Sequence, residues 1–487
     1  MPFPGFDPIL LPRLIIWTLV FGVLTISSAD PDLWGHVRFG LDIIRDTALT
    51  AIDPYSFTSD RPWINHEWLS EAIMGLAYTA GGAFGLGSLK VLVLGTGFVL
   101  LARDLKAQGL PPIPRDLWLV LAVMGCLYLT KTVRPQMFSI MLFIGLVVCL
   151  RRAEQDRRYL FAIPVIFAPW ANLHGGWLVG GAVLALWTAV RVVAPVGASR
   201  TAWLVAGASS VPATLLTPYG TDLWVFLWQT VGLGRADITE WQPVTTLDWG
   251  SMALWTIPVV VLAVAAVRRV TLPPTHLFAT VLLTALSFKV LRLVPFAAVT
   301  AVGLVGPLLH RAPARKAAPP ATGPLALAIL AAFVLAAVVV GAEVGRRNLS
   351  CLRSRLPWAA DADAARFILQ AGLSGRMATW FDWGEYAVWH LPGVQVSMDG
   401  RRETVYSDEV LNLHSTIYFA RPGWETALSQ LNPDFIWLPT TMSVVNQLPR
   451  LGWQLAFRTE RSVVFTRTPV SMPPPAAVSQ PDACFPA

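Results

Sequence analysis

Long apolar runs alternate with short polar connections over roughly the first two thirds of the chain. Several of these runs reach, or nearly reach, the roughly 20 residues that a helix needs to cross a bilayer. About eleven membrane-spanning helices are therefore predicted, over residues 9–28, 86–102, 117–130, 137–150, 159–171, 176–194, 202–216, 251–267, 274–288, 294–309 and 324–342. Residues 1–342 are expected to form one α-helical transmembrane domain, with an outer loop over 29–85.

The pattern changes after residue 342, where short apolar segments alternate with amphipathic ones. Strands are predicted at 376–381, 394–399, 434–439 and 462–467, and helices at 358–373 and 406–418. Strands that alternate with helices indicate a soluble α/β domain with a largely parallel sheet, placed here at 343–470. The proline-rich tail, 471–487, is expected to be poorly ordered.

Composition supports the membrane assignment, because 54% of the 487 residues are hydrophobic and only 14% are charged. A net charge of +7 could suggest nucleic acid, but no basic cluster interleaved with aromatic residues accompanies it, so nucleic-acid binding is not expected. Asp30, Pro31 and Asp32 follow the first apolar run instead of a small-residue cleavage site. That run is therefore expected to remain as a helix.

The positive-inside rule gives a topology with a cytoplasmic N-terminus in the plasma (inner) membrane. The strongly basic connections then all lie inside, namely those with Arg103, Lys106, Arg115, Arg151, Arg152, Arg157, Arg158, Arg200, Arg268, Arg269, Arg311, Arg315 and Lys316. Residues 29–85, 217–250 and the C-terminal domain lie outside. The assignment holds only if 68–84 is an interfacial or re-entrant helix.

The outer loop opens with an acidic segment, "SSADPDLWGH", at residues 27–36. Pro31 disfavours helical backbone at Asp30, so the first helix should end there. In extended backbone the side chains of Asp30 and Asp32 would lie on one side, roughly 7 Å apart. They could then share a cation or a substrate. Alternatively, Asp32 only caps the next helix, predicted over 33–46.

Further polar side chains in this loop are candidates for substrate binding: His36, Arg38, His66 and Glu67. Acidic residues such as Glu67 could instead complement the positive end of a helix dipole without any chemistry. A zinc site is not supported, because the residue four positions after His66 is Ser70 rather than a second histidine.

Two outer turns carry basic residues where the positive-inside rule would leave little charge. Lys131 and Arg134 lie in the first turn, and Lys289 and Arg292, three apart on one helical face, lie in the second. They are predicted to bind an anion, although long basic side chains also anchor helices by snorkelling. His174 is a weaker candidate ligand, since glycines beside it also fit a simple tight connection. Glu240 and Trp241 could contact a sugar.

This arrangement resembles the GT-C superfamily of membrane glycosyltransferases. The shared features are a first helix followed by an acidic pair, a long outer loop, a His-led segment running into "FGLGSLKVLVLGTG", further spans and an outer C-terminal domain. The resemblance covers roughly residues 9–310 and is strongest to members that use polyprenyl-phosphate sugars, such as protein mannosyltransferases and aminoarabinose transferases. It implies that Asp32, or Asp30, is the catalytic base or a metal-binding carboxylate. "HEWLSE" lacks the proline of the family's His-x-Pro-Leu segment, and Asp-Pro-Asp replaces its Asp-Glu pair.

The predicted function is therefore an inverting membrane glycosyltransferase. It would move a sugar from a polyprenyl-phosphate donor to a glycan, lipid or protein acceptor on the outer face. A carboxylate would accept the proton of the attacking group, and basic side chains would compensate the departing phosphate. The resemblance leaves open a divalent cation, Mg²⁺ or Mn²⁺, with Asp30 and Asp32 as its ligands if one binds. Transport or flipping of a lipid-linked sugar, and a non-catalytic sensor or scaffold, are the alternatives.

Two features of the C-terminal part add predictions. The segments 381–393 and 398–406 follow predicted strands, where α/β sheets bind ligands, so they either recognise the acceptor or form a structural cover over the outer loop. Cys351 and Cys484 both lie outside in the predicted topology, where disulfides form. A bridge between them is predicted, with a free thiol at Cys484 as the alternative.

Overall fold

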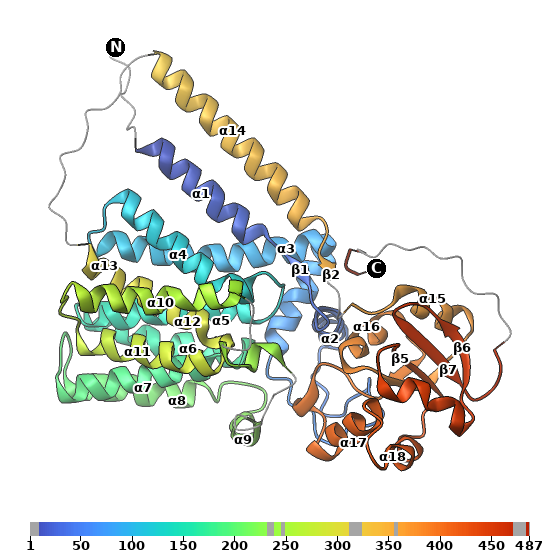
Figure 1. Cartoon of the computed structure of the whole chain (residues 1–487). Coiled ribbons are helices and arrows are strands. Elements are labelled where there is room, and N and C mark those ends of the chain that lie inside the picture. The colour runs from blue at the N-terminus through green and yellow to red at the C-terminus, as the bar shows by residue number, and fades with distance from the viewer. Residues whose placement is uncertain are drawn as a thin grey trace. The chain divides into compact units, whose positions relative to one another are not determined.

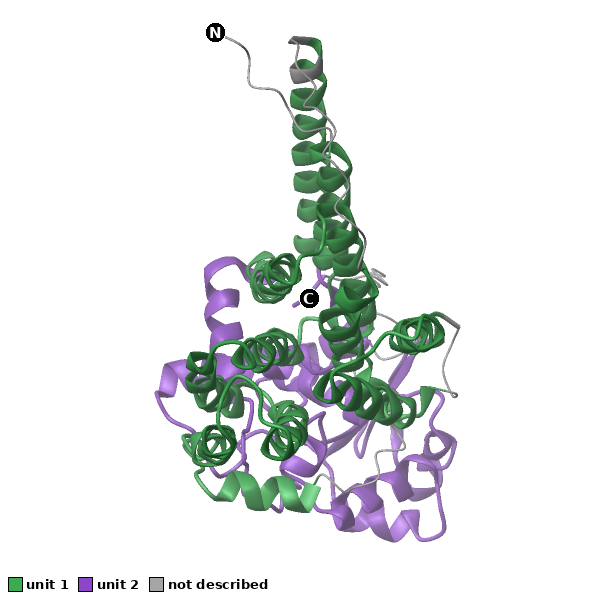
Figure 2. Ribbon diagram, turned by 90° about the vertical axis from the view of Figure 1, so that its left-hand side faces the viewer, with its two compact units in different colours: residues 1–27, 84–350 green, residues 28–83, 351–487 purple. Residues whose placement is uncertain are grey.

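The computed structural model describes residues 9–230, 238–244, 249–310, 324–354, 359–470 and 484–486. The chain forms two compact units. Unit 1 comprises residues 1–27 and 84–350, and unit 2 comprises 28–83 and 351–487 (Figure 2). Residues 28–83, predicted as an outer loop of the transmembrane domain, thus belong to the same unit as the C-terminal part.

Unit 1 consists of helices (Figure 1). They are α1 (Leu10–Thr25), the second part of α3 (Trp68–Ala107), α4 (Pro112–Thr130), α5 (Gln136–Ala153), α6 (Ala162–Leu173), α7 (Trp177–Val193), α8 (Arg200–Ala213), α9 (Asp222–Thr230), α10 (Trp249–Val267), α11 (Pro274–Lys289), α12 (Val294–Thr300), α13 (Gly306–Leu309) and α14 (Pro324–Leu349), with short 3-10 turns η1 (Arg157–Phe161), η2 (Thr239–Trp241) and η4 (Leu291–Leu293) and a π-helical turn, η5 (Ala301–Val305). Each predicted span falls on helical segments: 159–171 covers part of η1 and of α6, 294–309 covers α12, η5 and α13, and each of the others falls on a single helix.

Length and composition identify the helices that can cross a membrane. Within the described ranges five qualify, Trp68–Ala107, Pro112–Thr130, Gln136–Ala153, Leu291–Leu309 and Ala328–Leu349, and three shorter helices are apolar, Leu10–Thr25, Trp177–Val193 and Met252–Val267. The chain is therefore an integral membrane protein. The number of spans, about eleven, stays a prediction, because several predicted runs form helices that are short for a bilayer.

The helix α3 contains a break at Gly81 and Gly82, beside the boundary between the two units. Gly82 has φ of +56°, which favours glycine over other residues. The segment predicted as an interfacial helix, 68–84, therefore ends in a kink before the apolar run begins.

A fully buried lysine joins the ends of two helices in unit 1. The ammonium group of Lys90, on α3, donates hydrogen bonds to the carbonyl oxygens of Ile26 and Thr130. Ile26 caps the C-terminus of α1, and Thr130 is the last residue of α4. Carbonyls at a helix C-terminus lack intrahelical partners, and a positive charge there complements the helix dipole. Lys90 thus fixes the point at which the chain leaves α1 for the acidic segment.

Unit 2 contains a five-stranded sheet in the order β4-β3-β5-β7-β6. The strands are β3 (Gly375–Thr379), β4 (Val394–Val396), β5 (Phe435–Pro439), β6 (Gln454–Arg458) and β7 (Ser462–Thr466). β3 runs parallel to β4 and β5, whereas β7 runs antiparallel to β5 and β6. The sheet is therefore mixed rather than largely parallel, because a connection too short for a crossover joins β6 to β7. β6, which the sequence pattern missed, is a half-exposed edge strand.

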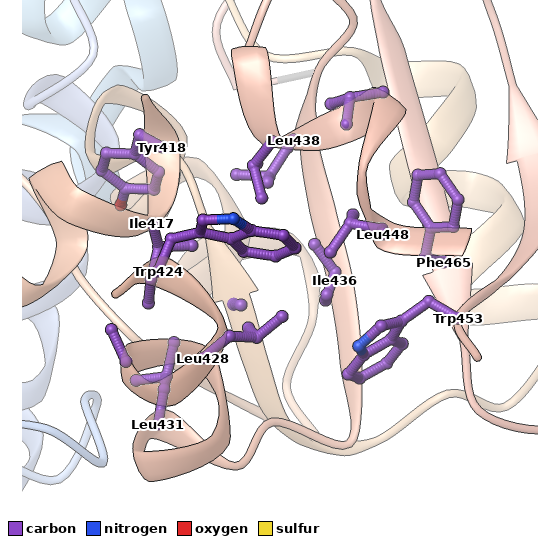
Figure 3. Packing of buried hydrophobic residues seen from close by; sticks show 14 of the residues in the cluster. Ile417, Tyr418, Trp424, Leu428, Leu431, Ile436, Leu438, Leu448, Trp453 and Phe465 are labelled. Atoms are coloured by element: carbon purple, nitrogen blue, oxygen red, sulfur yellow. The ribbon is translucent and has the colours of Figure 1, made fainter. Parts of the chain in front are cut away.

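The helices of unit 2 are α2 (Leu33–Asp46), the first part of α3, α15 (Ala362–Gln370), α16 (Phe381–His390), α17 (Asp408–Tyr418) and α18 (Trp424–Leu431), with the 3-10 turns η6 (Arg402–Thr404), η7 (Ser443–Asn446) and η8 (Leu448–Leu451). A buried apolar cluster packs α17 and α18 against the sheet. Figure 3 shows Trp424 and Leu428 of α18 beside Ile436 and Leu438 of β5. The amphipathic helices thus cover the sheet with their apolar faces.

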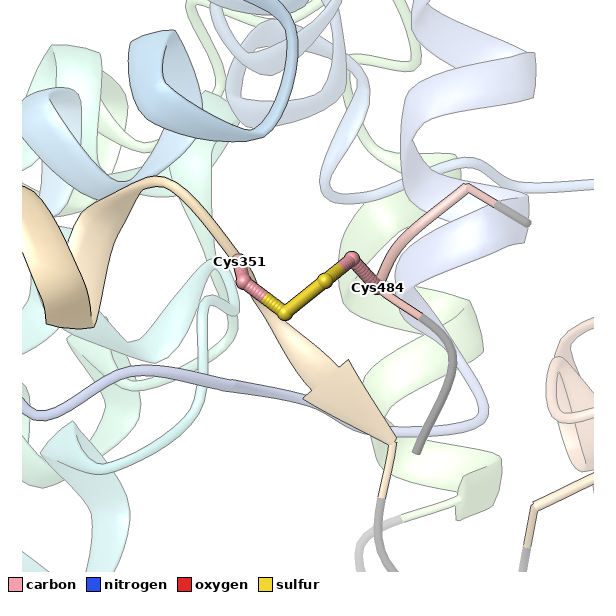
Figure 4. The surroundings of a disulfide bond; sticks show 2 residues. All are labelled: Cys351 and Cys484. Carbon is pink, nitrogen blue, oxygen red and sulfur yellow. A yellow bond between two sulfur atoms is a disulfide. The ribbon is translucent and has the colours of Figure 1, made fainter. Parts of the chain in front are cut away.

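Three separate stretches of sequence meet at the start of the C-terminal part. β1 (Ser28–Ala29) pairs in parallel with β2 (Arg353–Ser354). Cys351 and Cys484 form a disulfide, with their Cα atoms 4.9 Å apart, so the predicted bridge is confirmed (Figure 4). The backbone N–H of Phe485 donates to the carbonyl of Leu352, and the indole N–H of Trp34 donates to the carbonyl of Pro486. The bridge ties residues 484–486 to the rest of unit 2. The other residues of the predicted tail, 471–483 and 487, lie outside the described residues.

Removing this disulfide should destabilise unit 2. The bond closes a loop with a sequence separation of 133, which by the chain-entropy argument stabilises by up to about 4 to 5 kcal/mol. Thermal unfolding in detergent should show a lower midpoint for Cys484→Ser and for the double variant Cys351→Ser/Cys484→Ser. The control is Cys149→Ser, which removes a free thiol in unit 1 and should keep a higher midpoint than both. An unchanged midpoint, or a Cys484 that alkylates without reductant in the unaltered protein, contradicts this account.

Candidate active site

The acidic segment forms a turn. α1 ends at Thr25, earlier than predicted, and the N–H groups of Leu33 and His36 donate to the carbonyls of Asp30 and Asp32. The backbone at Asp32 is helical, with φ of −77° and ψ of −10°. The prediction of extended backbone is therefore wrong, since these two hydrogen bonds curl the chain into α2. The capping alternative is also wrong, because the side chain of Asp32 makes no cap hydrogen bond to α2.

Asp32 and Glu385 approach the same glycine. A Cβ placed on Gly400 would lie 2.4 Å from Oδ1 of Asp32 and 3.0 Å from Oε1 of Glu385. A Cβ on Gly35 would lie 2.1 Å from Oε2 of Glu385. Only glycine fits at these two positions without a shift of the carboxyl groups. Residues from the acidic segment, from α2 and from α16 therefore meet in one small space within unit 2.

A buried arginine binds two further carboxylates close by. The guanidinium of Arg401 donates to both oxygens of Asp53 at 2.8 Å and to both oxygens of Asp399 at 2.9 and 2.6 Å. The hydroxyl of Tyr406 donates to Asp399 at 3.1 Å. Burial raises the pKa of Asp53, and the charge and hydrogen bonds of Arg401 offset that rise only in part. Arg401 thus offsets part of the negative charge of the two carboxylates in a fixed geometry.

Aromatic rings surround the same guanidinium. It lies 5.0 Å from the ring centroid of Phe39, 5.3 Å from that of Tyr55 and 4.7 Å from that of Trp63. Cation–π attraction adds to the ion pairs, and the rings keep water away from them. The outer loop supplies all three rings, so this contact binds the loop to the C-terminal part.

The predicted substrate-binding residues of the outer loop divide into two groups. Nδ1 of His36 lies 3.1 Å from Oε1 of Glu71, whose other oxygen accepts from the amide of Asn65. Although burial alone would lower it, the Glu71 hydrogen bond and the charges of Glu67, Glu71 and Asp30 raise the pKa of His36. The raised pKa favours the protonated form of His36, which is the last residue of the acidic segment.

The second group lies in local ion pairs. Arg38 donates to Asp42 at 2.9 Å along α2, and the hydroxyl of Tyr55 donates to the same carboxylate. His66 lies 3.6 Å from the carboxylate of its neighbour Glu67. These contacts favour a structural role for Arg38, while the role of His66 and Glu67 in binding stays a prediction.

A second cluster, in which basic side chains surround a carboxylate, lies in unit 1. Arg134 donates to Glu240 at 2.5 Å, and Nε of Arg292 lies 3.7 Å from the other oxygen of the same carboxylate. Although burial would raise it, the charges of Arg134, Arg292 and Lys131 lower the pKa of Glu240. The guanidinium of Arg292 also lies 5.6 Å from the ring centroid of Trp241. Three predicted outer turns therefore meet here.

His174 supports Arg292 in this cluster. Nδ1 of His174 accepts a hydrogen bond from the N–H of Gly176 at 3.0 Å and lies 2.7 Å from Oγ of Ser139, which itself accepts from Trp170. Nε2 lies 3.1 Å from Nη2 of Arg292, within hydrogen-bond distance. The ring therefore contacts Arg292 through one nitrogen and Ser139 and Gly176 through the other, and so positions Arg292 in the cluster.

Lys289 does not join this cluster. α11 ends at Lys289, the next residue has extended backbone with φ of −135°, and Arg292 lies in the following 3-10 turn. The prediction that Lys289 and Arg292 share one helical face is wrong, because the helix ends between them. The side chain of Lys289 is exposed, and no described contact links it to Glu240.

Sequence reasoning missed Lys90, Glu385, Asp399 and Arg401. Their segments had been singled out, but nothing local in the pattern shows that a glycine of α2 faces Glu385 or that Asp53 faces Arg401. Among the described residues, no group of three or more His, Cys, Asp and Glu side chains is arranged to hold a metal ion. The divalent cation left open by the resemblance therefore finds no support in the donor set, and no step is derived through it.

Solved structures of membrane enzymes match nearly the whole chain. ArnT of Cupriavidus metallidurans bound to undecaprenyl phosphate matches over 94% of this chain and 98% of its own, with a TM-score of 0.56 and 12% identity. The apo oligosaccharyltransferase of Archaeoglobus fulgidus matches over 95% of this chain and 75% of its own, with a TM-score of 0.55 and 11% identity. The chain has the GT-C fold.

The likeness lies in the fold, because sequence identity is low throughout. The mycobacterial arabinofuranosyltransferase AftD also matches, over 96% of this chain and 42% of its own, with a TM-score of 0.52 and 15% identity. No family model and no curated protein sequence matches the chain. The resemblance to GT-C glycosyltransferases is thereby confirmed as a resemblance of structure, and the roles of individual residues have to be argued from their own contacts.

Replacing Arg401 should destabilise unit 2 more strongly as the pH rises. Arg401→Met leaves Asp53 and Asp399 buried without their cation, which costs about 3 to 5 kcal/mol when both are ionised. The pKa of Asp53, which burial already raises, then lies still further above its value in the unfolded chain, so the stability gap to the unaltered protein narrows at low pH and widens at high pH. Thermal unfolding at about pH 5 and about pH 8 measures the gap. The control Arg421→Met, at an exposed position of the same unit, should unfold at nearly the same midpoint as the unaltered protein at both pH values. A loss of stability in Arg401→Met that is the same at both pH values argues against the ion-pair account.

Proposed function

We propose that the chain is an integral membrane glycosyltransferase. It transfers a sugar from a polyprenyl-phosphate donor to an acceptor on the outer face of the membrane, with inversion at the anomeric carbon. The observation that carries the proposal is the acidic turn at Asp30 and Asp32, which follows the first helix of a chain with the GT-C fold.

The structural neighbours support this class of donor. ArnT was solved with undecaprenyl phosphate, and the archaeal oligosaccharyltransferase AglB with dolichol-phosphate and an inhibitory peptide. Both ligands are polyprenyl phosphates, and both proteins are similar to this chain along most of its length. A lipid-linked donor therefore agrees with both the fold and the apolar helices.

The reaction needs a base and a stabilised leaving group. The acceptor's hydroxyl or amide attacks the anomeric carbon, the bond from that carbon to the phosphate oxygen breaks, and the polyprenyl phosphate leaves with the electron pair. A carboxylate takes the proton from the attacking atom. We assign this role to Asp32, because its carboxyl group is partly buried and its Oδ1 lies close to Gly400, as does Oε1 of Glu385.

The basic cluster of unit 1 suits the phosphate. Lys131, Arg134 and Arg292 surround the single carboxylate of Glu240, so positive charge is in excess among these four groups. A phosphate dianion would compete with Glu240 for the same guanidinium groups, and His174, which contacts Arg292, would hold that arginine in place. Arg292 and His174 are thus assigned to donor binding, together with Arg134.

Loss of the base should abolish transfer without loss of fold. Asp32→Asn should lower turnover at least about a hundredfold, measured with undecaprenyl-phosphate mannose, arabinose and aminoarabinose as donors. Asp46→Asn, at the exposed end of α2, should leave turnover unchanged. Full activity of Asp32→Asn together with inactivity of Asp30→Asn moves the assignment to Asp30; activity of both variants and of their double rejects the proposal.

The basic cluster can be tested with the lipid phosphate alone. Arg134→Ala and Arg292→Ala should each weaken binding of undecaprenyl phosphate about tenfold or more, because each removes a charge-assisted hydrogen bond. Lys289→Ala is the matched control, since Lys289 is exposed and lies outside the cluster. Equal affinity in all three variants would return these arginines to the role of interfacial anchors.

A further inference from the structure

The carboxyl group of Glu385 is enclosed between α16 and α2. Its side chain is 3% exposed, and its Oε2 atom fills the space beside Gly35. Within the described part of the chain, Oε2 has no hydrogen-bond partner. An ionised carboxylate in such a place loses its hydration without replacement, which is unfavourable.

The surroundings of Glu385 add negative charge. The charged groups that act on it come from the acidic segment, from α3 and from the loop after β4: Asp30, Glu71, Asp399 and Arg401, while Asp32 approaches Gly400 together with it. Arg401, the positive group among these, donates to Asp53 and Asp399. Like charges so close together cannot all be ionised.

We propose that Glu385 is a positioning residue for Asp32, holding a proton and donating it in a hydrogen bond to the Asp32 carboxylate beside Gly400. The role of Asp32 as base rests on the proposed function, whereas the protonated pair does not. The pair then carries one negative charge, located on Asp32. This arrangement fixes the direction of the Asp32 carboxylate and keeps it ionised for proton transfer.

The position of Gly400 supports the pairing. Oδ1 of Asp32 and Oε1 of Glu385 both lie within 3.0 Å of the Cβ position of this glycine. No side chain from position 400 can therefore separate the two carboxyl groups. Burial, followed by the charge of Asp399, raises the pKa of Glu385 well above its usual range, and Arg401 offsets this only in part.

The first test requires no substrate. Because the folded protein keeps a proton that the unfolded chain releases above the ordinary glutamate pKa, Glu385 lowers stability progressively as the pH rises toward its folded value. Glu385→Gln removes this dependence and keeps a donor of similar shape. Its unfolding midpoint should rise relative to the unaltered protein with increasing pH, and the infrared band of a buried protonated carboxyl should disappear. Glu460→Gln, at an exposed turn between β6 and β7, should change neither readout.

The second test uses the pH dependence of transfer. In the unaltered enzyme, turnover should fall about tenfold per pH unit above the pKa of Glu385, as ionised Glu385 repels Asp32. Glu385→Gln should stay active and lose this alkaline decline, whereas Glu385→Leu should lose turnover at every pH because no donor remains.

The outcomes separate the two proposals. The pairing is overturned if Glu385→Gln and the unaltered protein show the same infrared band and the same pH dependence of stability. It is also overturned if the Glu385→Gln enzyme is inactive at every pH. If the substrate-free readouts change as expected but Asp32→Asn transfers normally, the protonated pair stands and the assignment of Asp32 as base fails.

Discussion

Unit 2 depends on the ion pairs of Arg401, which join residues that are 348 positions apart in the sequence. The guanidinium binds Asp53 of the outer loop and Asp399 of the segment after β4, and three aromatic rings of the loop enclose it. A buried charge is tolerated only when such partners are complete. The outer loop and the C-terminal part are therefore folded as one body, and the acidic turn takes its shape from that body. The disulfide between Cys351 and Cys484 and the pairing of β1 with β2 close the same unit at its other end.

In unit 1 the corresponding constraint is the set of carbonyl groups at helix C-termini, which have no partner within their own helix. Lys90 satisfies carbonyls at the C-termini of α1 and α4, which a bilayer would leave without partners. The residues directly after these ends are functional candidates: Asp30 follows α1 within a few positions, and Lys131 follows α4 immediately. One lysine thus controls where the acidic segment begins and where the basic turn begins.

The sequence was informative where structure is local. Periodic apolar runs predicted the positions of the helices, and alternation predicted β3, β4, β5 and β7. It failed where the outcome depends on distant contacts or on single backbone angles. The turn at Asp32, the helix end after Lys289 and the edge strand β6 are decided by one or two hydrogen bonds or by tertiary packing. No local feature of the sequence indicates that residues 28–83 fold together with residues 351–487. Glu385 therefore looked like an ordinary polar position in an amphipathic helix.

The two clusters handle charge in opposite ways, and this difference is informative about chemistry. Around Glu385 the carboxyl groups outnumber the cations, so protons must balance the charge and the groups become sensitive to pH. Around Glu240 the charges of Arg134, Arg292 and Lys131 lower the pKa of the carboxyl group, so these cations favour a negative charge at that place. A transfer between a phosphate leaving group and a protic acceptor needs both environments, one that exchanges protons and one that accepts negative charge.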